Sequence, residues 1–254
     1  MAARAPAVLP VRLGVFVAGV GALLYAVLVL AVVPQPLALE RASARIAMGD
    51  RYRAEELDRL SGLAADLAAA PLMRATSLRA AALVALRQAE TATDDGRRAD
   101  IDTHMDALAR RVPAALAAAP ADPFLWLALF WRDNVAEGFQ ETRLPLLAMS
   151  YATGPYEGWV GVKRSVVTLA LWGRLTPALQ AAAAEEFVGL VQSRFREMPE
   201  ILTGPGWEAR HVLLPRMADL DQRLRREFAR TLNRAGVDVK VPGIERPSIR
   251  PWVP

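Results

Sequence analysis

An uncharged apolar run near the N-terminus constrains this chain more than any other feature. It spans 21 residues, from Leu13 to Val33, and contains no Asp, Glu, Lys or Arg. At about 1.5 Å per residue, a helix of this length would measure about 30 Å, the thickness of a bilayer's hydrocarbon core. Pro34 and Pro36 follow and are expected to end the helix, because proline lacks an amide hydrogen. The run therefore predicts one transmembrane helix over residues 13–33, after an N-terminal tail of residues 1–12.

A cleaved signal peptide is the main alternative for this run. The apolar core of a signal peptide is normally about 7–15 residues long, and this run is longer. The stretch Ala42-Ser43-Ala44 has the composition of a cleavage site, but it lies well past the end of the run. The sequence therefore favours an uncleaved anchor.

Charges on either side of the run leave its orientation open. Arg4 and Arg12 precede it, whereas four arginines follow it closely, at positions 41, 45, 51 and 53. A literal count of positive charge would keep the large domain in the cytoplasm. Long domains, however, cross the membrane largely regardless of charge.

One face of the run is lined by small residues. Gly14, Ala18, Ala22 and Ala26 recur every four residues, a spacing that lets two membrane helices approach closely. This predicts a self-association face and a homodimer through the membrane helix. The alternative is that an alanine-rich sequence produces such a stripe by chance.

Composition indicates an all-α chain. Alanine and leucine, both strong helix formers, supply much of the 53% hydrophobic content, and strict apolar–polar alternation is nearly absent. The chain has no cysteine, which excludes disulfides and thiolate metal sites. Its arginines are scattered and mostly have acidic neighbours, and the net charge is only +4. This pattern is typical of a solvated helical surface and does not predict nucleic-acid binding.

Apolar spacing predicts a series of helices with short breaks. The expected helices lie near residues 53–69, 73–89, 99–118, 123–138, 144–152, 159–173, 177–191 and 217–232. Asp122-Pro123 and Thr176-Pro177 are expected to start helices as a capping residue followed by proline, and Gly138 is expected to end one. Pro113 should kink or split its helix. Residues 91–96 read as a loop, and Asp219–Arg223 and Asp221–Arg225 as surface pairs.

A weak internal echo suggests repeats. Pro123 with Trp126 is similar to Pro155 with Trp159, and the two tryptophans are 33 residues apart, close to the tetratricopeptide period of about 34 residues. We expect antiparallel helix pairs in a tetratricopeptide-like solenoid over residues 53–235, with an irregular helical bundle as the alternative. Residues 34–52 would form a linker and the start of the first helical region, and the proline-rich residues 236–254 an extended tail.

The titratable clusters do not predict a catalytic, cofactor or metal site. Asp100, Asp102, His104 and Asp106 are the densest group, but a metal site needs three or four converging ligands, and an acidic solvated turn explains them. Glu208 and His211 form one Glu-x-x-His motif, whereas a di-iron bundle needs two. The pair Glu185-Glu186 reads as a solvated face.

Aromatic residues cluster in the middle of the chain. Most should belong to the core, because large rings contribute large buried areas. A groove lined by the remaining rings would bind a peptide or a sugar face. The residues expected in such a partner-binding surface are Phe124, Trp126, Trp131, Tyr156, Trp159 and Trp172.

Three stretches read Ala119-Pro120-Ala121-Asp122-Pro123-Phe124-Leu125-Trp126, Gly154-Pro155-Tyr156-Glu157-Gly158-Trp159 and Leu171-Trp172. They resemble small single-span proteins encoded in bacterial exopolysaccharide gene clusters, of the Vps polysaccharide-biosynthesis type. The likeness covers residues 40–196 and transfers no catalytic residue. It implies an inner-membrane anchor, a periplasmic helical domain and an accessory role.

The first functional hypothesis is a non-catalytic, membrane-anchored accessory protein whose partners are membrane proteins of envelope or exopolysaccharide assembly. A general envelope scaffold, acting in secretion or cytochrome assembly, is the alternative. A second alternative is an enzyme whose site is assembled from dispersed residues such as Glu157, Arg164 and His211.

Overall fold

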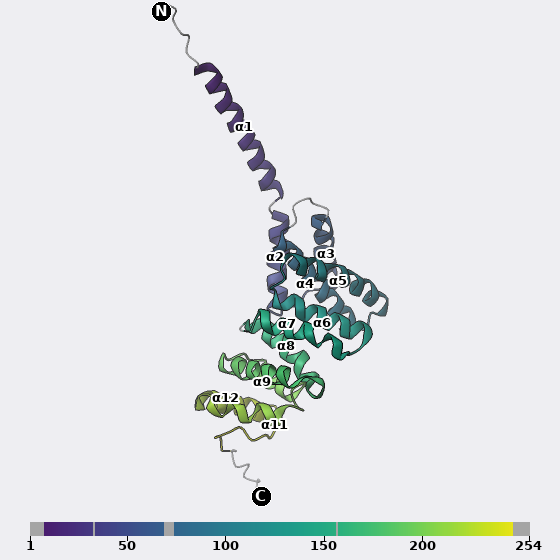
Figure 1. Cartoon of the computed structure of the whole chain (residues 1–254), viewed down its shortest axis with the longest axis vertical. Helices are drawn as coiled ribbons and strands as arrows, with labels where there is room; N and C mark the ends of the chain where they lie inside the picture. The colour runs from purple at the N-terminus through teal and green to yellow at the C-terminus, as the bar shows by residue number, and fades with distance from the viewer. Residues whose placement is uncertain (1–7, 33, 69–73, 156, 246–254) are drawn as a thin grey trace, which may run out of the picture. The chain divides into compact units, whose positions relative to one another are not determined.

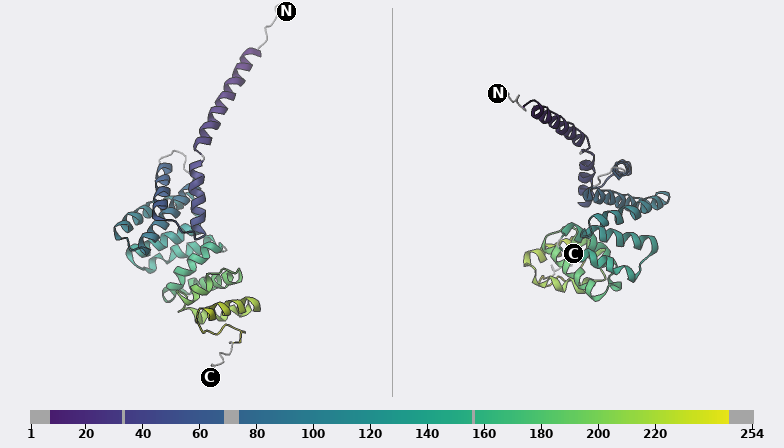
Figure 2. Two further views of the ribbon diagram at one scale, coloured as in Figure 1. Left: turned by 180° about the vertical axis from the view of Figure 1, so that it is seen from behind. Right: turned by 45° about the horizontal axis from the view of Figure 1, so that its top comes forward.

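Helices make up all the regular structure of the computed structural model in the parts of the chain that it describes, residues 8–32, 34–68, 74–155 and 157–245. This confirms the all-α prediction. The chain divides into two compact units, residues 1–98 and 99–254. Figures 1 and 2 show the helices of each unit in order.

Unit 1 contains α1 (Val8–Val32), α2 (Pro34–Ala47), α3 (Ala54–Ala68) and α4 (Ala75–Asp94). Both α2 and α3 pack on α4, whose residues 80–86 are buried on every side of the helix. Polar side chains fasten the same helices together. Glu40 on α2 accepts hydrogen bonds from the hydroxyls of Thr76 and Ser77 at 2.7 and 3.1 Å, and Gln88 donates to Asp58 at 2.8 Å.

The expected linker and loop of unit 1 are largely helical. Residues 34–47 form α2, so Pro34 begins a helix, a position where its missing amide hydrogen costs nothing. The loop expected over residues 91–96 is replaced by a continuation of α4 to Asp94. Gly96, with φ 66°, then takes the left-handed conformation that glycine adopts readily.

The N-terminal run was expected to cross a membrane. Among the described residues, no helix meets both the length and the hydropathy needed for a span. The expected span lies partly outside those residues, since Val33 and the side chains of residues 8–13 and 28–32 are not described. Gly14, Ala18, Ala22 and Ala26 lie on α1 and are exposed.

Unit 2 contains most of the long helices. They are α5 (Arg98–Ala118), α6 (Pro123–Glu137), α7 (Leu144–Thr153), α8 (Gly158–Ala170), α9 (Pro177–Gln192) and α12 (Gln222–Arg234). Consecutive helices pack as the pairs α6/α7 and α8/α9, as in helical repeats. Next to them, α9 and α12 lie side by side in Figures 1 and 2, and the ring of Phe187 meets the edge of Phe228 with centroids 6.4 Å apart.

The helix starts and stops of unit 2 follow the expected capping chemistry. The carboxylate of Asp122 accepts from the backbone N–H groups of Phe124 and Leu125, and Thr176 accepts from that of Leu179. Each cap precedes a proline that opens the helix. Gly138, with φ 77°, ends α6. These three predictions are confirmed.

Of the two expected effects of Pro113, a kink or a split, the split does not occur, since α5 runs unbroken from Arg98 to Ala118. A proline within a helix leaves the carbonyl four residues earlier without its usual donor. That carbonyl belongs to Ala109, and it accepts a hydrogen bond from Nη1 of Arg132 at 3.4 Å. A neighbouring helix therefore supplies the donor that proline lacks.

The C-terminal part of unit 2 differs most from expectation. Two short helices, α10 (Met198–Thr203) and α11 (Arg210–Leu213), were not predicted, and Met217 lies in a 3₁₀ turn (Pro215–Asp219) before the last helix. Asp221 caps α12 and so does not pair along it. Arg225 donates to the carbonyl oxygens of Leu220 and Pro242, which holds the first part of the expected extended tail against the fold.

We expect Gly154→Ala to lower the free energy of unfolding by about 1–3 kcal/mol, the usual cost of overpacking a core. The added Cβ would lie 2.4 Å from Cγ of Pro123. Gly189→Ala on α9 is the control, since its Cβ meets nothing within 4 Å, and it should raise stability by about 1 kcal/mol. Denaturant unfolding followed by tryptophan fluorescence measures both changes. Equal stability of the two variants would contradict the close contact between α6 and the end of α7.

Candidate functional site

A fully buried arginine lies at the centre of unit 2. Arg164, on α8, has a relative exposure of 0%, and its guanidinium pairs with the carboxylate of Glu186 on α9. The pair is bidentate, because Nε donates to Oε2 at 3.0 Å while Nη2 donates to Oε1. Burying a charge is costly unless it is paired and its remaining donors are satisfied.

The other donors of Arg164 reach the end of α7. Nη1 donates to the carbonyl oxygen of Ser150 and, at 3.0 Å, to its hydroxyl, and Nη2 donates to the carbonyl oxygen of Gly154 at 3.0 Å. The hydroxyl of Ser150 in turn donates to the carbonyl oxygen of Pro123 at 2.8 Å. One guanidinium thus joins α7, α8 and α9 directly, and reaches the start of α6 through Ser150.

Tyr151 lies against the same guanidinium, with the carbon Cζ of Arg164 at 4.2 Å from the ring centroid. Burial raises the pKa of the Tyr151 phenol above its ordinary value, and the nearby negative charge of Glu186 raises it further. The phenol therefore keeps its proton at neutral pH and donates a hydrogen bond to the hydroxyl of Thr168 at 3.5 Å, so it does not serve as a base.

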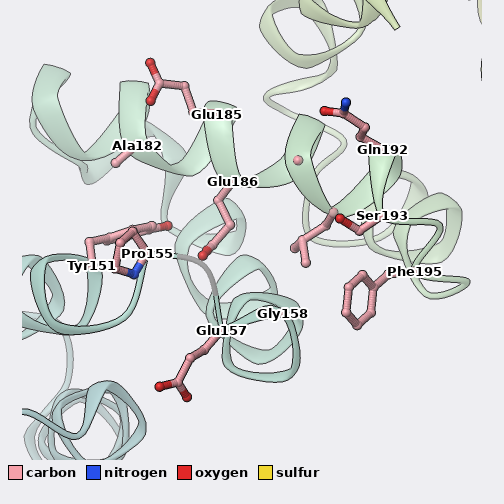
Figure 3. Close-up of a pocket in the computed structure, with 12 residues that line it drawn as sticks. Tyr151, Pro155, Glu157, Gly158, Ala182, Glu185, Glu186, Gln192, Ser193 and Phe195 are labelled. Atoms are coloured by element: carbon pink, nitrogen blue, oxygen red, sulfur yellow. The ribbon is translucent and has the colours of Figure 1, made fainter. Parts of the chain in front are cut away.

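A pocket of about 640 Å³ opens beside this network, between the α7–α8 connection and α9 (Figure 3). Tyr151 and Phe195 give it aromatic walls. Its charged lining residues are Glu157, Glu185 and Glu186, and no Lys, Arg or His is among the described residues that line it. Because Glu186 is neutralised by Arg164, the unpaired negative charge at the pocket comes from Glu157 and Glu185.

Phe195 is held in the pocket wall by a glycine. A Cβ added at Gly158 would lie 2.3 Å from Cζ of Phe195, so the ring packs directly on the backbone at the start of α8. The ring also borders a second, smaller hollow of about 210 Å³ next to α12. Any larger residue at position 158 would displace this wall.

The aromatic residues that were expected to form one binding surface differ in how deeply they are buried. Phe124 and Trp172 are buried, while Trp126, Trp131 and Trp159 are half-buried. The ring of Trp159 packs on Phe124 at 5.0 Å, and the indole of Trp126 donates to the carbonyl oxygen of Pro120 at 2.8 Å. Tyr156 lies outside the described residues.

The three residues of the dispersed-site hypothesis have different surroundings. Glu157 lines the pocket, Arg164 lies beneath it, and His211 is exposed on α11 and is not among the described lining residues. Glu208 approaches Gly173, within 3.0 Å of the position of an added Cβ. In the part of the chain that the structure describes, no three His, Cys, Asp or Glu residues are placed to hold a metal ion, including those near His104.

Sequence reasoning missed most of the pocket. Glu186 was expected on a solvated face, but its side chain is only 7% exposed. Tyr151, Ser193 and Phe195 also line the pocket and were not singled out. A signal was present in the helical spacing, since Glu186 lies three residues after the buried Ala183 and four before the buried Leu190. An acid and an arginine on the buried faces of successive helices indicate an internal pair.

Comparisons with protein-family models, with curated proteins and with solved structures found no match.

We expect Arg164→Met to cost about 3–5 kcal/mol of unfolding free energy, because it leaves the buried Glu186 without its partner. The double variant R164M/E186M should lose less than the sum of the two single losses, since it removes both charges. Arg196→Gln is the control, because Arg196 is 94% exposed in its pair with Glu197, and its effect should stay within about 0.5 kcal/mol. Denaturant unfolding of the unsubstituted chain, R164M, E186M, R164M/E186M and R196Q measures these changes. Additive losses would contradict the coupling of Arg164 to Glu186.

Proposed function

We propose that this chain is a non-catalytic, membrane-anchored scaffold protein of bacterial envelope or exopolysaccharide biosynthesis and export. In this proposal Leu13–Val33 is the single transmembrane helix in the inner membrane, and the helical units lie in the periplasm. The 21-residue uncharged run supports the anchor, since its length suits a bilayer core. The resemblance of residues 40–196 to accessory proteins of exopolysaccharide gene clusters supports the setting.

The observation that carries the scaffold role is the pocket beside α9. Its volume of about 640 Å³ lies within the range of roughly 300–1,000 Å³ that is typical of ligand pockets. It combines aromatic walls with carboxylates at Glu157 and Glu185. The titratable side chains nearest to the pocket are not free to act as catalytic groups. Arg164 is paired with Glu186, and Tyr151 keeps its proton. This arrangement favours holding a partner over chemistry.

The pairing of helices adds to this interpretation. The pairs α6/α7 and α8/α9 are joined by short breaks and locked together through Arg164. A stiff set of helix pairs presents a constant surface to a partner, which is how tetratricopeptide-like domains bind. We therefore propose that the partner is a membrane protein of polysaccharide assembly and that it contacts unit 2 at this pocket.

Site-specific photo-cross-linking in native membranes tests this function. A photoreactive residue at Ser193, which lines the pocket, should form adducts with glycosyltransferases, flippases or chain-length regulators. The same residue at Ala178, which is exposed on α9 and not part of the described lining, should form far fewer. Equal adducts from both positions would contradict a role for the pocket. Adducts with secretion or haem-handling proteins alone would replace polysaccharide assembly with a general envelope scaffold.

The proposed topology makes a separate prediction. Alkaline phosphatase fused after Arg250 should be active, because the enzyme forms its disulfides in the oxidising periplasm. A fluorescent cytoplasmic reporter fused at the same point should be dark. The reverse pattern, with inactive phosphatase and bright fluorescence, would place the helical units in the cytoplasm and remove the periplasmic setting. Immunoblots of both fusions control for expression.

A further inference from the structure

A row of arginines runs along the exposed face of α12. Its members are Arg223, Arg226, Arg230 and Arg234, all exposed. Steps of three, four and four residues place them on one face of the helix, over an axial length of about 16 Å. The opposite face of α12 is buried, with Phe228 and Leu232 in the core. We refer to these four residues as the arginine row.

Two acidic groups close to the arginine row, Glu227 and Asp221, are engaged elsewhere. Glu227, the one acid within α12, forms an ion pair with Arg194 at 3.4 Å. Asp221 accepts from the backbone N–H groups of Arg223 and Leu224 as the helix cap. Arg226 donates to the side-chain oxygen of Gln222, which is neutral. Within residues 157–245 as described, no member of the row forms an ion pair.

This placement of charge works against the helix. Like charges three or four residues apart on a helix repel each other, and the four arginines of the row form three successive pairs at this spacing. Arg223 lies in the first turn, where the helix dipole disfavours a positive charge, whereas Arg234 lies in the last turn, where the dipole favours one. The buried face of α12 consists of Phe228, Ala229 and Leu232. The arginines on the outer face take no part in this packing. An unfavourable local choice of this kind points to a partner of opposite charge.

We propose that the arginine row docks on anionic phospholipid headgroups of the membrane that anchors the chain, an inference that rests on the proposed anchor. Guanidinium groups bind phosphate oxygens through two parallel hydrogen bonds. The hollow beside α12 is lined by its other residues, Leu224, Glu227, Phe228 and Thr231, so the row itself forms a surface without a described cavity. A row of this kind suits a planar array of headgroups better than a ligand that must be enclosed.

The docking is electrostatic and does not insert the helix into lipid. Phe228, Ala229 and Leu232 of α12 are buried and Leu224 is half-buried, so the helix offers no exposed apolar face to enter a bilayer. Exposed charges are screened by salt, which shortens their reach to about 8 Å at physiological ionic strength. The docking should therefore require anionic lipid and weaken steeply as salt is added.

Energy transfer from the full chain in vesicles tests the proposal. The chain has no cysteine, so Asn233→Cys gives one labelling position on the exposed side of α12. The dye-labelled protein is reconstituted into vesicles that carry headgroup acceptors, either of phosphatidylcholine alone or with phosphatidylglycerol added. Transfer should be stronger with phosphatidylglycerol and should fall in high salt. In R226Q/R230Q/R234Q the ratio of docked to undocked protein should drop by roughly 100-fold, at about fivefold per arginine.

The matched control is R110Q/R174Q/R196Q, which removes three exposed arginines from the same unit but none from the arginine row. It should leave the transfer unchanged. Equal transfer with and without phosphatidylglycerol, or an equal loss in both triple variants, would overturn the proposal. The proposal would also be overturned if energy transfer occurred in neutral vesicles and only added nucleic acid or an acidic protein abolished it. Flotation of the vesicles distinguishes failure of the docking proposal from failure of the proposed anchor. A chain that does not float with either lipid lacks the anchor, whereas a chain that floats without lipid-dependent transfer lacks only the docking.

Discussion

The ion pair between Arg164 and Glu186 is the interaction on which the rest of unit 2 depends. Two buried charges lose their hydration, and replacing such a pair with apolar residues of similar volume is often neutral or even stabilising. The pair therefore contributes more to specificity than to net stability. The guanidinium is satisfied only when the end of α7, the middle of α8 and the middle of α9 lie in one arrangement. Any slip of one helix would leave a buried charge without its partner.

The pocket follows from that arrangement. At the end of α7 the carbonyl oxygen of Gly154 accepts a hydrogen bond from Arg164. In this position the Cα of Gly154 lies so close to Pro123 that a Cβ would clash with the proline ring. The chain then turns through Pro155 and Glu157 into α8, and these residues form one wall of the pocket. The opposite wall comes from α9, whose Glu186 is held by the same arginine. The network that fixes the helices thus also sets the width of the opening.

The capping residues of the helices could be predicted from the sequence. Which face of each helix is buried could not. The caps at Asp122 and Thr176 depend on residues a few positions apart, so they were visible in the sequence. On α8 helical spacing places Val166 with the apolar Val162 and Leu169, yet Val166 is 44% exposed. The buried face carries Arg164, Ser165 and Thr168. Apolar spacing misidentifies a face whose polar groups are satisfied by other helices. Pro113 shows the same limit, because its replacement donor, Arg132, comes from a different helix.

The surroundings of an arginine decide what it can do in this protein. Arg164 is enclosed by acceptors and has no capacity left for a partner, whereas the arginine row on α12 has none of its charge neutralised by an ion pair among the described residues. Attraction of about 1 kcal/mol per arginine gives the row about 4 kcal/mol, which corresponds to millimolar binding for a free domain. A tether raises the effective concentration to a similar millimolar level. Under the proposed anchor, docking would therefore be close to balance, so that modest changes in salt or lipid charge shift unit 2 between docked and free.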